Sequence, residues 1–270
     1  MNIAICFDKN YQKWATVCLN SIWLHYNGNS RIRVVIMSDI NYHQCIWQLK
    51  RVLKNFDFSF DNPGSDFDQM PTGFHFNVTT YWRLALPRVL AMQNIDKAIY
   101  IDADTLSLEN LQELYNTDLE GKACGGCLDI GSMEHTERLE LKQKFAINGG
   151  VLLMDVERMN KIDWVEESNR LNNEGIIKWV DQDVINILLD NDIQLIDLRW
   201  NVQSGNFQNS YNGSVSIVHF TESNNTKPFN IRGKHRFMGV YNTHIRRSGF
   251  YLDYLWFETF RRTKKLRIFS

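Results

Sequence analysis

The chain has 270 residues, of which 44% are hydrophobic and 13% aromatic, so it can bury the core of one large domain and is not a disordered protein. Its formal net charge of −1 argues against a globally basic nucleic-acid-binding protein. No apolar run is long enough to predict a transmembrane helix, and the start MNIAICFDKN does not have the pattern of a secretory signal. Five cysteines, an odd number, favour reduced thiols, and the C-x-x-C at 124–127 is interpreted as two small residues near the end of a strand.

The first half of the chain alternates strand and helix patterns. Apolar, β-branched runs predict strands, and apolar residues at helical spacing predict helices. The predicted strands are 2–7, 33–37 and 97–101, and the predicted helices are 11–26, 42–53 and 78–90. Pro87 is expected to shorten or bend the last of these helices. Alternating strands and helices predict a mostly parallel sheet that is covered on both faces.

The second half of the chain is more mixed. Its predicted strands are 123–128, 151–154, 193–196 and 216–218, and its predicted helices are 156–172, 183–189 and 251–262. No internal repeat, low-complexity tract or Gly/Ser-rich linker divides the chain. We therefore expect one α/β domain over residues 1–245, followed by a basic, aromatic tail over 246–270.

Two aspartates follow the predicted strand 97–101 directly. Ligands of open α/β sheets bind beyond the carboxyl ends of the strands, which is where Asp102 and Asp104 stand. Two carboxylates two residues apart can both reach one cation, and Mg²⁺ and Mn²⁺ prefer such oxygen ligands and also accept diphosphate oxygens. An Asp-x-Asp pair alone is a weak signal, because a solvated turn has the same pattern. The buried strand before it favours a metal site for a reaction that releases a nucleoside diphosphate.

Several further segments appear in a recognisable order: CFDKNY at 6–11, TTYWRL at 79–84, NGGVLL at 148–153, DQD at 181–183 and HF at 219–220 followed by KPF at 227–229. With these segments, residues 1 to 229 resemble glycosyltransferase family 8, most of all the bacterial α-galactosyltransferases and α-glucosyltransferases of lipopolysaccharide and lipooligosaccharide synthesis. The resemblance implies a GT-A-type α/β fold, a single Rossmann-like domain with a mixed, mostly parallel central sheet.

The resemblance also implies roles for individual residues. His219 would complete a Mn²⁺ or Mg²⁺ site with Asp102 and Asp104, and His75 would lie on the acceptor side, although an ordinary loop histidine is an equal alternative. Residues implied to bind the UDP-sugar donor are Asp8, Asn10, Tyr11, Arg83, Ala103, Asn148 and Lys227. Helix capping is the alternative role for Asp8, for Asn10 and for the aspartates of the DQD segment.

The implied reaction transfers a hexose from a UDP-sugar to a saccharide acceptor with retention of configuration. Asp181 would bind the transferred sugar, Gln182 would lie beneath its anomeric carbon, and Asp129 would lie near the sugars. An amide is a poor nucleophile, which favours a front-face route in which the leaving diphosphate takes the acceptor's proton. Asp181 or Asp129 as a covalent nucleophile stays open.

The segment after His219 departs from the family pattern. Lys227 stands eight residues after His219 instead of six, Glu222 replaces a glycine and Phe229 replaces a tryptophan. This departure keeps a second hypothesis open, a UDP-sugar-binding protein without efficient transfer activity. A nucleotidyltransferase is disfavoured, because CFDKNY is not a Gly-rich, basic loop.

The carboxyl-terminal tail interleaves aromatic residues with the basic run RRTKKLR at 261–267. Such a segment can lie on an anionic membrane, with its rings at the interface and its cations near the headgroups. A helix packed on the domain is the alternative, and nucleic-acid binding is not expected. We expect a protein of the bacterial cytoplasm. Peripheral contact with the inner membrane and a lipid-linked acceptor are compatible with this expectation.

Overall fold

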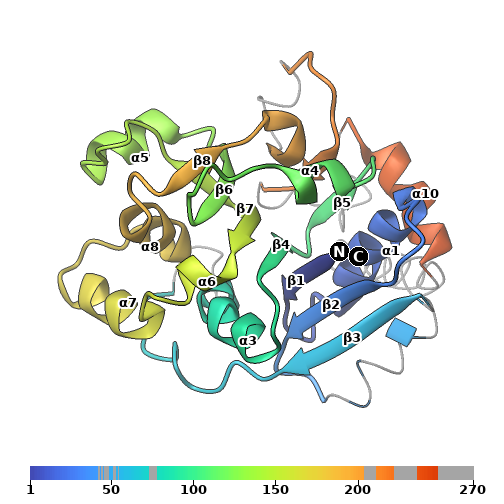
Figure 1. The fold of residues 1–270 in the computed structure, drawn as a ribbon, viewed down its shortest axis with the longest axis horizontal. Helices are drawn as coiled ribbons and strands as arrows, with labels where there is room; N and C mark the ends of the chain where they lie inside the picture. The colour runs from blue at the N-terminus through green and yellow to red at the C-terminus, as the bar shows by residue number, and fades with distance from the viewer. Residues whose placement is uncertain are drawn as a thin grey trace, which may run out of the picture.

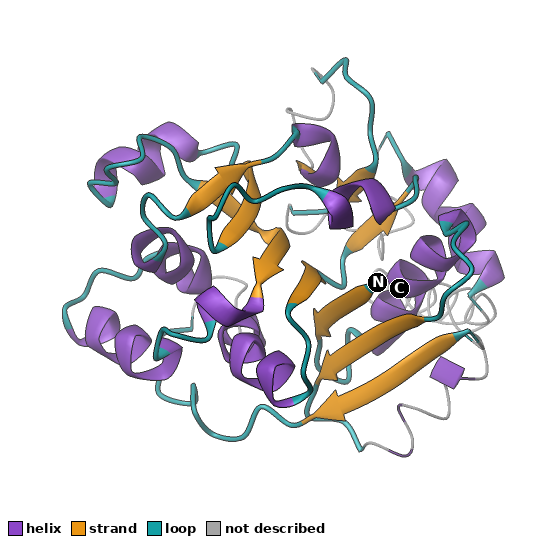
Figure 2. Ribbon diagram, viewed as in Figure 1, coloured by secondary structure: helices purple, strands orange, loops and turns teal. Residues whose placement is uncertain are grey.

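The computed structural model describes residues 1–41, 43, 45, 49–50, 53, 55–72, 78–203, 211–221 and 236–248. A seven-stranded sheet forms the centre of this part of the chain, with helices on both of its faces (Figures 1 and 2). Its strands are β1 (Asn2–Cys6), β2 (Ile32–Met37), β3 (Phe56–Asp61), β4 (Lys97–Ile101), β6 (Cys124–Leu128), β7 (Ile147–Asp155) and β8 (Ile193–Leu195). Their order is β3-β2-β1-β4-β7-β6-β8, and β7 alone runs antiparallel to its neighbours. The predicted mixed, mostly parallel sheet is confirmed.

Apolar side chains fill both faces of this sheet. Successive strand residues point to opposite faces, so Ile3 and Ile5 of β1 join one hydrophobic cluster and Ala4 and Cys6 join the other. One face is covered by α1 (Gln12–His25) and α4 (Gln112–Asn116), and the other by η1 (Val78–Ala85), α3 (Leu86–Met92), α6 (Val156–Met159), α7 (Trp164–Asn173) and α8 (Val180–Leu188). Strands buried on both faces read as continuous apolar runs, which is why they were predictable.

A second, small sheet continues from the carboxyl end of β4. It consists of β5 (Thr105–Ser107), β9 (Val202–Gln203) and β10 (Ile217–His219), in the order β5-β10-β9. Two further short elements are α5 (Ser132–Arg138), which follows β6, and η2 (Leu198–Asn201), which leads directly into β9. These short elements do not form continuous apolar patterns, and they carry four residues of the candidate site, His135, Arg138, Asn201 and His219.

Several predicted boundaries are wrong. β7 begins four residues earlier than predicted, because Asn148, Gly149 and Gly150 belong to the strand and not to a loop. The predicted helix 156–172 is two helices, since the side chain of Asp163 accepts a hydrogen bond from the backbone N–H of Glu166 and starts α7. α8 begins at Val180, three residues earlier than predicted.

Pro87 starts a helix instead of bending one. Residues 78–85 form the 3₁₀ helix η1, and Pro87 lies in the first turn of α3, where a missing N–H costs nothing. The prediction of one helix over 78–90 is therefore wrong in its continuity. Most of the predicted helix 42–53 and all of the predicted helix 251–262 lie outside the described residues. β3, β5, α4, α5 and α10 (Met238–Arg247) had no predicted counterpart.

The five cysteines are free and buried. Both cysteines of the C-x-x-C belong to β6, but Cys124 begins this strand, so the interpretation of two residues at the end of a strand holds only for Cys127. Burial raises the pKa of the Cys124 thiol to about 12, and this thiol is not poised as a metal ligand or nucleophile. Within the described part of the chain, no helix combines the length and the apolar character needed to cross a bilayer.

Helix α10 packs on α1 through aromatic side chains. The rings of Trp14 and Tyr241 lie 6.4 Å apart between centroids, and those of His25 and His244 lie 5.6 Å apart. His244 is only 6% exposed. Burial, followed by the neighbouring His25 and Arg247, lowers the pKa of His244 to about 4.

This pKa predicts a loss of stability in mild acid. Between pH 6.5 and about 4 the unfolded chain binds a proton at His244 that the folded chain does not bind, so the free energy of unfolding falls as the pH is lowered through this window. The loss amounts to about 1.4 kcal/mol per pH unit and about 3 kcal/mol in total. Urea unfolding at several pH values should show a flatter dependence for His244→Gln than for the unmodified chain. The exposed-residue control His43→Gln should keep the original slope, and an unchanged slope in His244→Gln would contradict the assignment.

Candidate functional site

The metal-type cluster forms at the carboxyl end of β4. Asp102 and Asp104 leave this strand, and β5 then pairs antiparallel with β10 in a register that sets Thr105 opposite His219. The pairing brings His219 Nε2 to 3.5 Å from Asp102 Oδ2 and 3.4 Å from Asp104 Oδ1. One ligand atom of each residue lies within 4.8 Å of the others, so one cation could contact all three.

The surroundings fit a divalent cation. Two carboxylates and an imidazole suit Mn²⁺ or Mg²⁺, particularly when diphosphate oxygens complete the shell. Gly150 of β7 makes the space for this cluster, because a Cβ there would lie 2.0 Å from His219 Cε1 and 2.9 Å from Asp102 Oδ2. The backbone N–H of Asp102 donates to the Gly150 carbonyl at 2.8 Å, which fixes strand β7 against the cluster.

Arg83 joins the cluster to the DQD segment. It projects from η1, and its Nε lies 2.7 Å from Asp181 Oδ2 while its Nη2 lies 3.2 Å from Asp102 Oδ1. Its guanidinium also lies 4.8 Å from the ring centroid of Tyr100, whose hydroxyl donates to Asp102 Oδ1. The sequence predicted that Arg83 contacts the sugar donor and acidic neighbours. The structure shows the acidic neighbours, Asp102 and Asp181, and the contact with the sugar donor stays a prediction.

Asp181 is 2% exposed at the start of α8. Burial raises the pKa of its carboxyl to about 7, although the Arg83 guanidinium acts in the opposite direction. A buried carboxyl with such a shift, paired with a specific charge, is typical of functional sites.

A strained turn positions this start of α8. Val180 has a φ of 42°, in a region that β-branched residues rarely adopt. The carboxylate of Asp183 holds the turn, since its Oδ2 accepts from the backbone N–H groups of Lys178 and Trp179 at 2.7 and 2.8 Å. Arg138 of α5 donates to the other oxygen at 2.5 Å. The capping role that the sequence left open for the DQD aspartates therefore holds for Asp183.

Replacing Asp183 by asparagine is expected to destabilise the fold by about 2–3 kcal/mol, because an NH₂ group would face either Arg138 or two backbone N–H donors in a buried place. Urea unfolding would measure this loss. The exposed helix cap Asp163 offers a matched control. Asp163→Asn should cost well under about 1 kcal/mol, because asparagine caps a helix about as well as aspartate. Equal costs for the two variants would show that Asp183 is only an ordinary cap.

A second group of polar side chains lies beside Asp181. Asn148 Nδ2 donates to Asp129 Oδ2 at 3.0 Å and to Gln182 Oε1 at 3.1 Å, and Gln182 Oε1 also accepts from the backbone N–H of Gly149 at 3.3 Å. His135 Nε2 lies 3.3 Å from Asp129 Oδ1. Burial opposes ionisation of Asp129, but hydrogen bonds from His135, Asn148 and the Gly131 N–H outweigh it and lower its pKa.

The nucleoside-side segment begins at the end of β1. Asp8 Oδ1 accepts from the backbone N–H groups of Asn10 and Tyr11 at 2.8 and 3.0 Å, so this carboxylate shapes the turn before α1. Asn10 is exposed, Tyr11 is half-buried and Ala103 is buried. Asp8 therefore stabilises the turn before α1, and its recognition of the nucleoside base stays a prediction.

Two predicted residues, His75 and Lys227, lie outside the described residues. The structure also contains site residues that the sequence did not predict, namely His135, Arg138, Tyr100 and Asn201. His135 and Arg138 share α5, a helix with no apolar periodicity to reveal it. Tyr100 stood inside an apolar strand pattern, where an aromatic residue indicates only packing.

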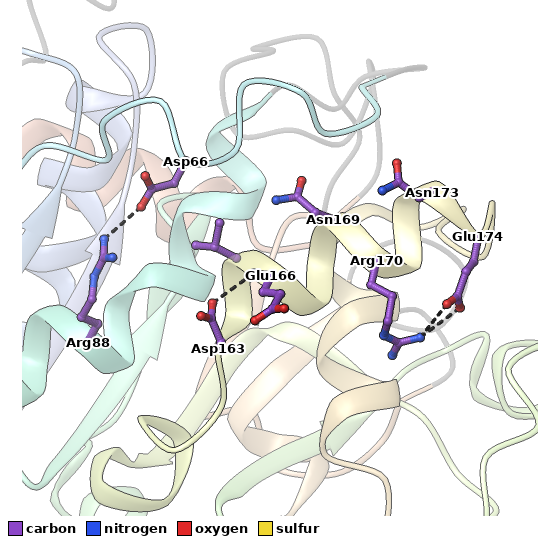
Figure 3. Close-up of a pocket in the computed structure, with 9 residues that line it drawn as sticks. Asp66, Arg88, Asp163, Glu166, Asn169, Arg170, Asn173 and Glu174 are labelled. Atoms are coloured by element: carbon purple, nitrogen blue, oxygen red, sulfur yellow. Dashed lines mark hydrogen bonds and ion pairs between the residues drawn. The ribbon is translucent and has the colours of Figure 1, made fainter.

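A cavity of about 800 Å³ opens elsewhere, over α7 and beside α3 (Figure 3). Both of its arginines form ion pairs with lining carboxylates, Arg88 with Asp66 at 2.9 Å and Arg170 with Glu174 at 3.0 Å. It contains none of the residues predicted for the site. We assign it no role in the chemistry.

Comparisons with known proteins find similar sequences. Residues 2–231 match the model of glycosyl transferase family 8. A putative glycosyltransferase of Haemophilus influenzae is 32% identical over 217 residues, which cover 74% of this chain and 63% of that protein. The chain thus spans less than two thirds of the length of this relative. A lipopolysaccharide 1,2-glucosyltransferase of Escherichia coli is 22% identical over 85% of this chain and 72% of that protein.

Solved structures share the fold. The galactosyltransferase LgtC, crystallised with donor and acceptor sugar analogs, superimposes with a TM-score of 0.80 at 21% identity, covering 91% of this chain and 95% of that one. At this sequence identity the structural similarity shows a shared fold only, and it confirms the predicted GT-A type of fold.

Proposed function

Since the chain belongs to glycosyl transferase family 8, we propose that it is a metal-dependent, retaining enzyme that transfers galactose or glucose from a UDP-sugar to a saccharide acceptor. The observation that carries this proposal is the cluster of Asp102, Asp104 and His219 at the carboxyl end of β4. Arg83 connects this cluster to the buried Asp181, because it forms ion pairs with both Asp102 and Asp181. This arrangement supports a cation site for a diphosphate next to a carboxyl group that would hold a sugar.

Asp102, Asp104 and His219 would hold Mn²⁺ or Mg²⁺, which when bound neutralises the charge of the departing diphosphate. Arg83 contacts both Asp102 and Asp181, so it keeps the metal side and the sugar side in one fixed arrangement. We propose Asp8, Asn10, Tyr11, Ala103 and Lys227 as further donor contacts, as the family resemblance implies.

The sugar side is built from Asp181, Gln182, Asn148 and Asp129. A carboxyl group whose pKa is about 7 can accept or donate a hydrogen bond at neutral pH, and this suits Asp181 for binding hydroxyls of the transferred sugar. Gln182 Oε1 already accepts from Asn148 and Gly149, so it is a poor candidate for attack on the anomeric carbon. We therefore favour the front-face route, with Asp129 and His75 on the acceptor side.

We further propose that the acceptor is a bacterial surface glycan such as lipopolysaccharide, on the basis of the name that the Escherichia coli relative carries. The tail 246–270 would hold the enzyme at the cytoplasmic face of the inner membrane through its aromatic and basic residues. The domain boundary near residue 245 is part of this proposal.

The test is release of UDP from UDP-galactose, UDP-glucose and UDP-N-acetylglucosamine, each with Mn²⁺ or with EDTA. Slow release from one donor that stops in EDTA and in Asp104→Ala is the expected result, with a loss on the order of 10³-fold. Arg88→Met, at an exposed ion pair, is the matched control and should keep the activity. Tight UDP binding with Mn²⁺ but no turnover, even with saccharide acceptors, would favour the binding-protein hypothesis, and absence of UDP binding would refute the proposal.

A further inference from the structure

A buried row of hydrogen bonds connects the metal-type cluster with the sugar side. His219 Nδ1 lies 2.9 Å from Asn201 Oδ1, and Asn201 Nδ2 donates to Asn148 Oδ1 at 2.9 Å. Asn148 Nδ2 then donates to Asp129 Oδ2 at 3.0 Å. Asn201 is 0% exposed and His219 is 4% exposed, so these bonds are shielded from water.

The direction of every bond in this row follows from its fixed ends. The backbone N–H of Gly150 can only donate, and it reaches Asn148 Oδ1 at 3.0 Å, while the ionised carboxylate of Asp129 can only accept. Asn148 must therefore turn its oxygen towards Asn201 and its NH₂ towards Asp129. Asn201 must in turn offer its NH₂ to Asn148 and its oxygen to His219. An amide oxygen accepts only, so His219 Nδ1 carries the proton.

The backbone supports this placement of Asn201. It is the last residue of η2, and β9 begins at the next residue. β9 pairs parallel with β10 in a register that sets Gln203 opposite His219 and Val202 opposite Val218. The end of η2, directly before the neighbouring strand β9, thus places Asn201 beside the imidazole ring without any ligand.

We propose that Asn201 is a positioning residue that holds His219 as the Nδ1–H tautomer, so that the lone pair of Nε2 faces Asp102 and Asp104. This inference deepens the proposed function, on which it rests, since it concerns the same cation site. A histidine that ligates a metal through one nitrogen is oriented by the hydrogen bond of the other, and removal of such a partner lowers metal affinity about 10–100-fold. Asn148 serves both sides, with its oxygen holding Asn201 and its NH₂ holding Asp129 and Gln182.

The experiment compares two substitutions that break different bonds. Asn201→Leu removes both the acceptor for His219 and the donor for Asn148. Asn201→Asp keeps an acceptor for His219 Nδ1–H, loses the donor to Asn148 and adds a negative charge beside the imidazole. Affinity for Mn²⁺ in the presence of UDP, measured by electron paramagnetic resonance of free Mn²⁺, should fall about 10–100-fold in Asn201→Leu and should be at least as high in Asn201→Asp as in the unmodified chain. Asn20, a buried asparagine whose Nδ2 has no hydrogen-bond partner within the described residues, gives the control Asn20→Leu, which should bind Mn²⁺ normally.

A spectroscopic readout separates orientation from mere packing. Two-bond ¹H–¹⁵N correlation spectra of ¹⁵N-histidine protein with UDP and Mg²⁺ distinguish the two tautomers, and His219→Gln identifies the signal. We expect an Nδ1–H signal for His219 in the unmodified chain and in Asn201→Asp, and its loss in Asn201→Leu. The inference would be overturned by an Nε2–H signal for His219 in the unmodified chain. It would also be overturned if both Asn201 variants lost Mn²⁺ affinity equally, if neither lost it, or if the unmodified chain did not bind Mn²⁺. If Mn²⁺ binds and the ranking holds but no donor is cleaved, the inference stands and the transfer activity is what fails.

Discussion

Gly150→Ala is expected to abolish tight Mn²⁺ binding although it adds only one methyl group. The added Cβ would lie 2.0 Å from His219 Cε1, 2.5 Å from His219 Nδ1 and 2.9 Å from Asp102 Oδ2. These are three atoms of two residues that we assign to the cation, and the His219 ring is also held by Asn201 Oδ1, which lies 2.9 Å from its Nδ1. The ring cannot move away from the methyl group without leaving both its hydrogen bond and its place beside Asp104.

We expect Mn²⁺ affinity in the presence of UDP to fall on the order of 100-fold or more in Gly150→Ala. The free energy of unfolding should fall by about 1–3 kcal/mol, as is usual when a packed interior receives an extra methyl group. Calorimetric titration and urea unfolding would measure the two effects on the same samples.

Two glycines offer graded controls for this experiment. A Cβ at neighbouring Gly149 would lie 3.2 Å from Arg83 Nη1, so Gly149→Ala should disturb binding less than Gly150→Ala. A Cβ at Gly239 of α10 meets nothing within 4 Å, and Gly239→Ala should keep full Mn²⁺ affinity. An unchanged Mn²⁺ affinity in Gly150→Ala would mean that the backbone of β7 shifts to accommodate the methyl group. It would contradict a rigid placement of His219.

The central strands and the position of the site were predictable because both depend on local patterns. β1, β2 and β4 are buried on both faces and therefore form continuous apolar runs. The rule that ligands bind beyond the carboxyl ends of such strands then indicates Asp102 and Asp104 from the sequence.

The residues that complete the site depend on contacts that no local pattern reveals. His219 reaches the aspartates through pairing of β5 with β10, two strands of three residues each, and only the family resemblance pointed to it. Asn201 and His135 were not predicted, since a single asparagine or histidine has no periodicity. Asn148 was predicted near the donor, but the predicted strand began only after Gly150, because glycine-rich segments resemble loops. The packing of Gly150 against His219 is a tertiary effect.

Arg83→Met should be among the most damaging single substitutions in the chain. Arg83 has a side chain only 9% exposed and lies between the carboxylates of Asp181 and Asp102. Its removal leaves two acidic groups without their buried cation, which typically costs about 3–5 kcal/mol of folding free energy. Because Arg83 lowers the pKa of Asp181, that pKa should rise further above its present value of about 7, and Asp181 should be protonated at neutral pH in the variant.

Urea unfolding and donor cleavage would measure these effects, with an expected loss in kcat/KM of about 10²–10³-fold. Arg88→Met removes an arginine that is 61% exposed from an ion pair with Asp66, and it should cost at most about 1 kcal/mol. A similar cost for the two arginines would contradict the assignment of Arg83 as the buried link of the site. Arg83→Lys keeps the charge but cannot contact both carboxylates through a planar fork, so it should regain more stability than activity.

A double substitution separates charge from packing at this link. If the cost of Arg83→Met comes from the Asp181 carboxyl, which without its cation must take up a proton to stay buried, then adding Asp181→Asn should restore part of the stability, because the amide is neutral and needs no cation. The two single costs should then sum to more than the cost of the double variant, by about 0.5–3 kcal/mol. If the cost arises from lost packing around the guanidinium, the two costs should add, and Asp181 would not be the group that Arg83 stabilises. In either case donor cleavage should stay low in the double variant, because on our proposal the sugar loses the carboxyl group of Asp181 that binds it.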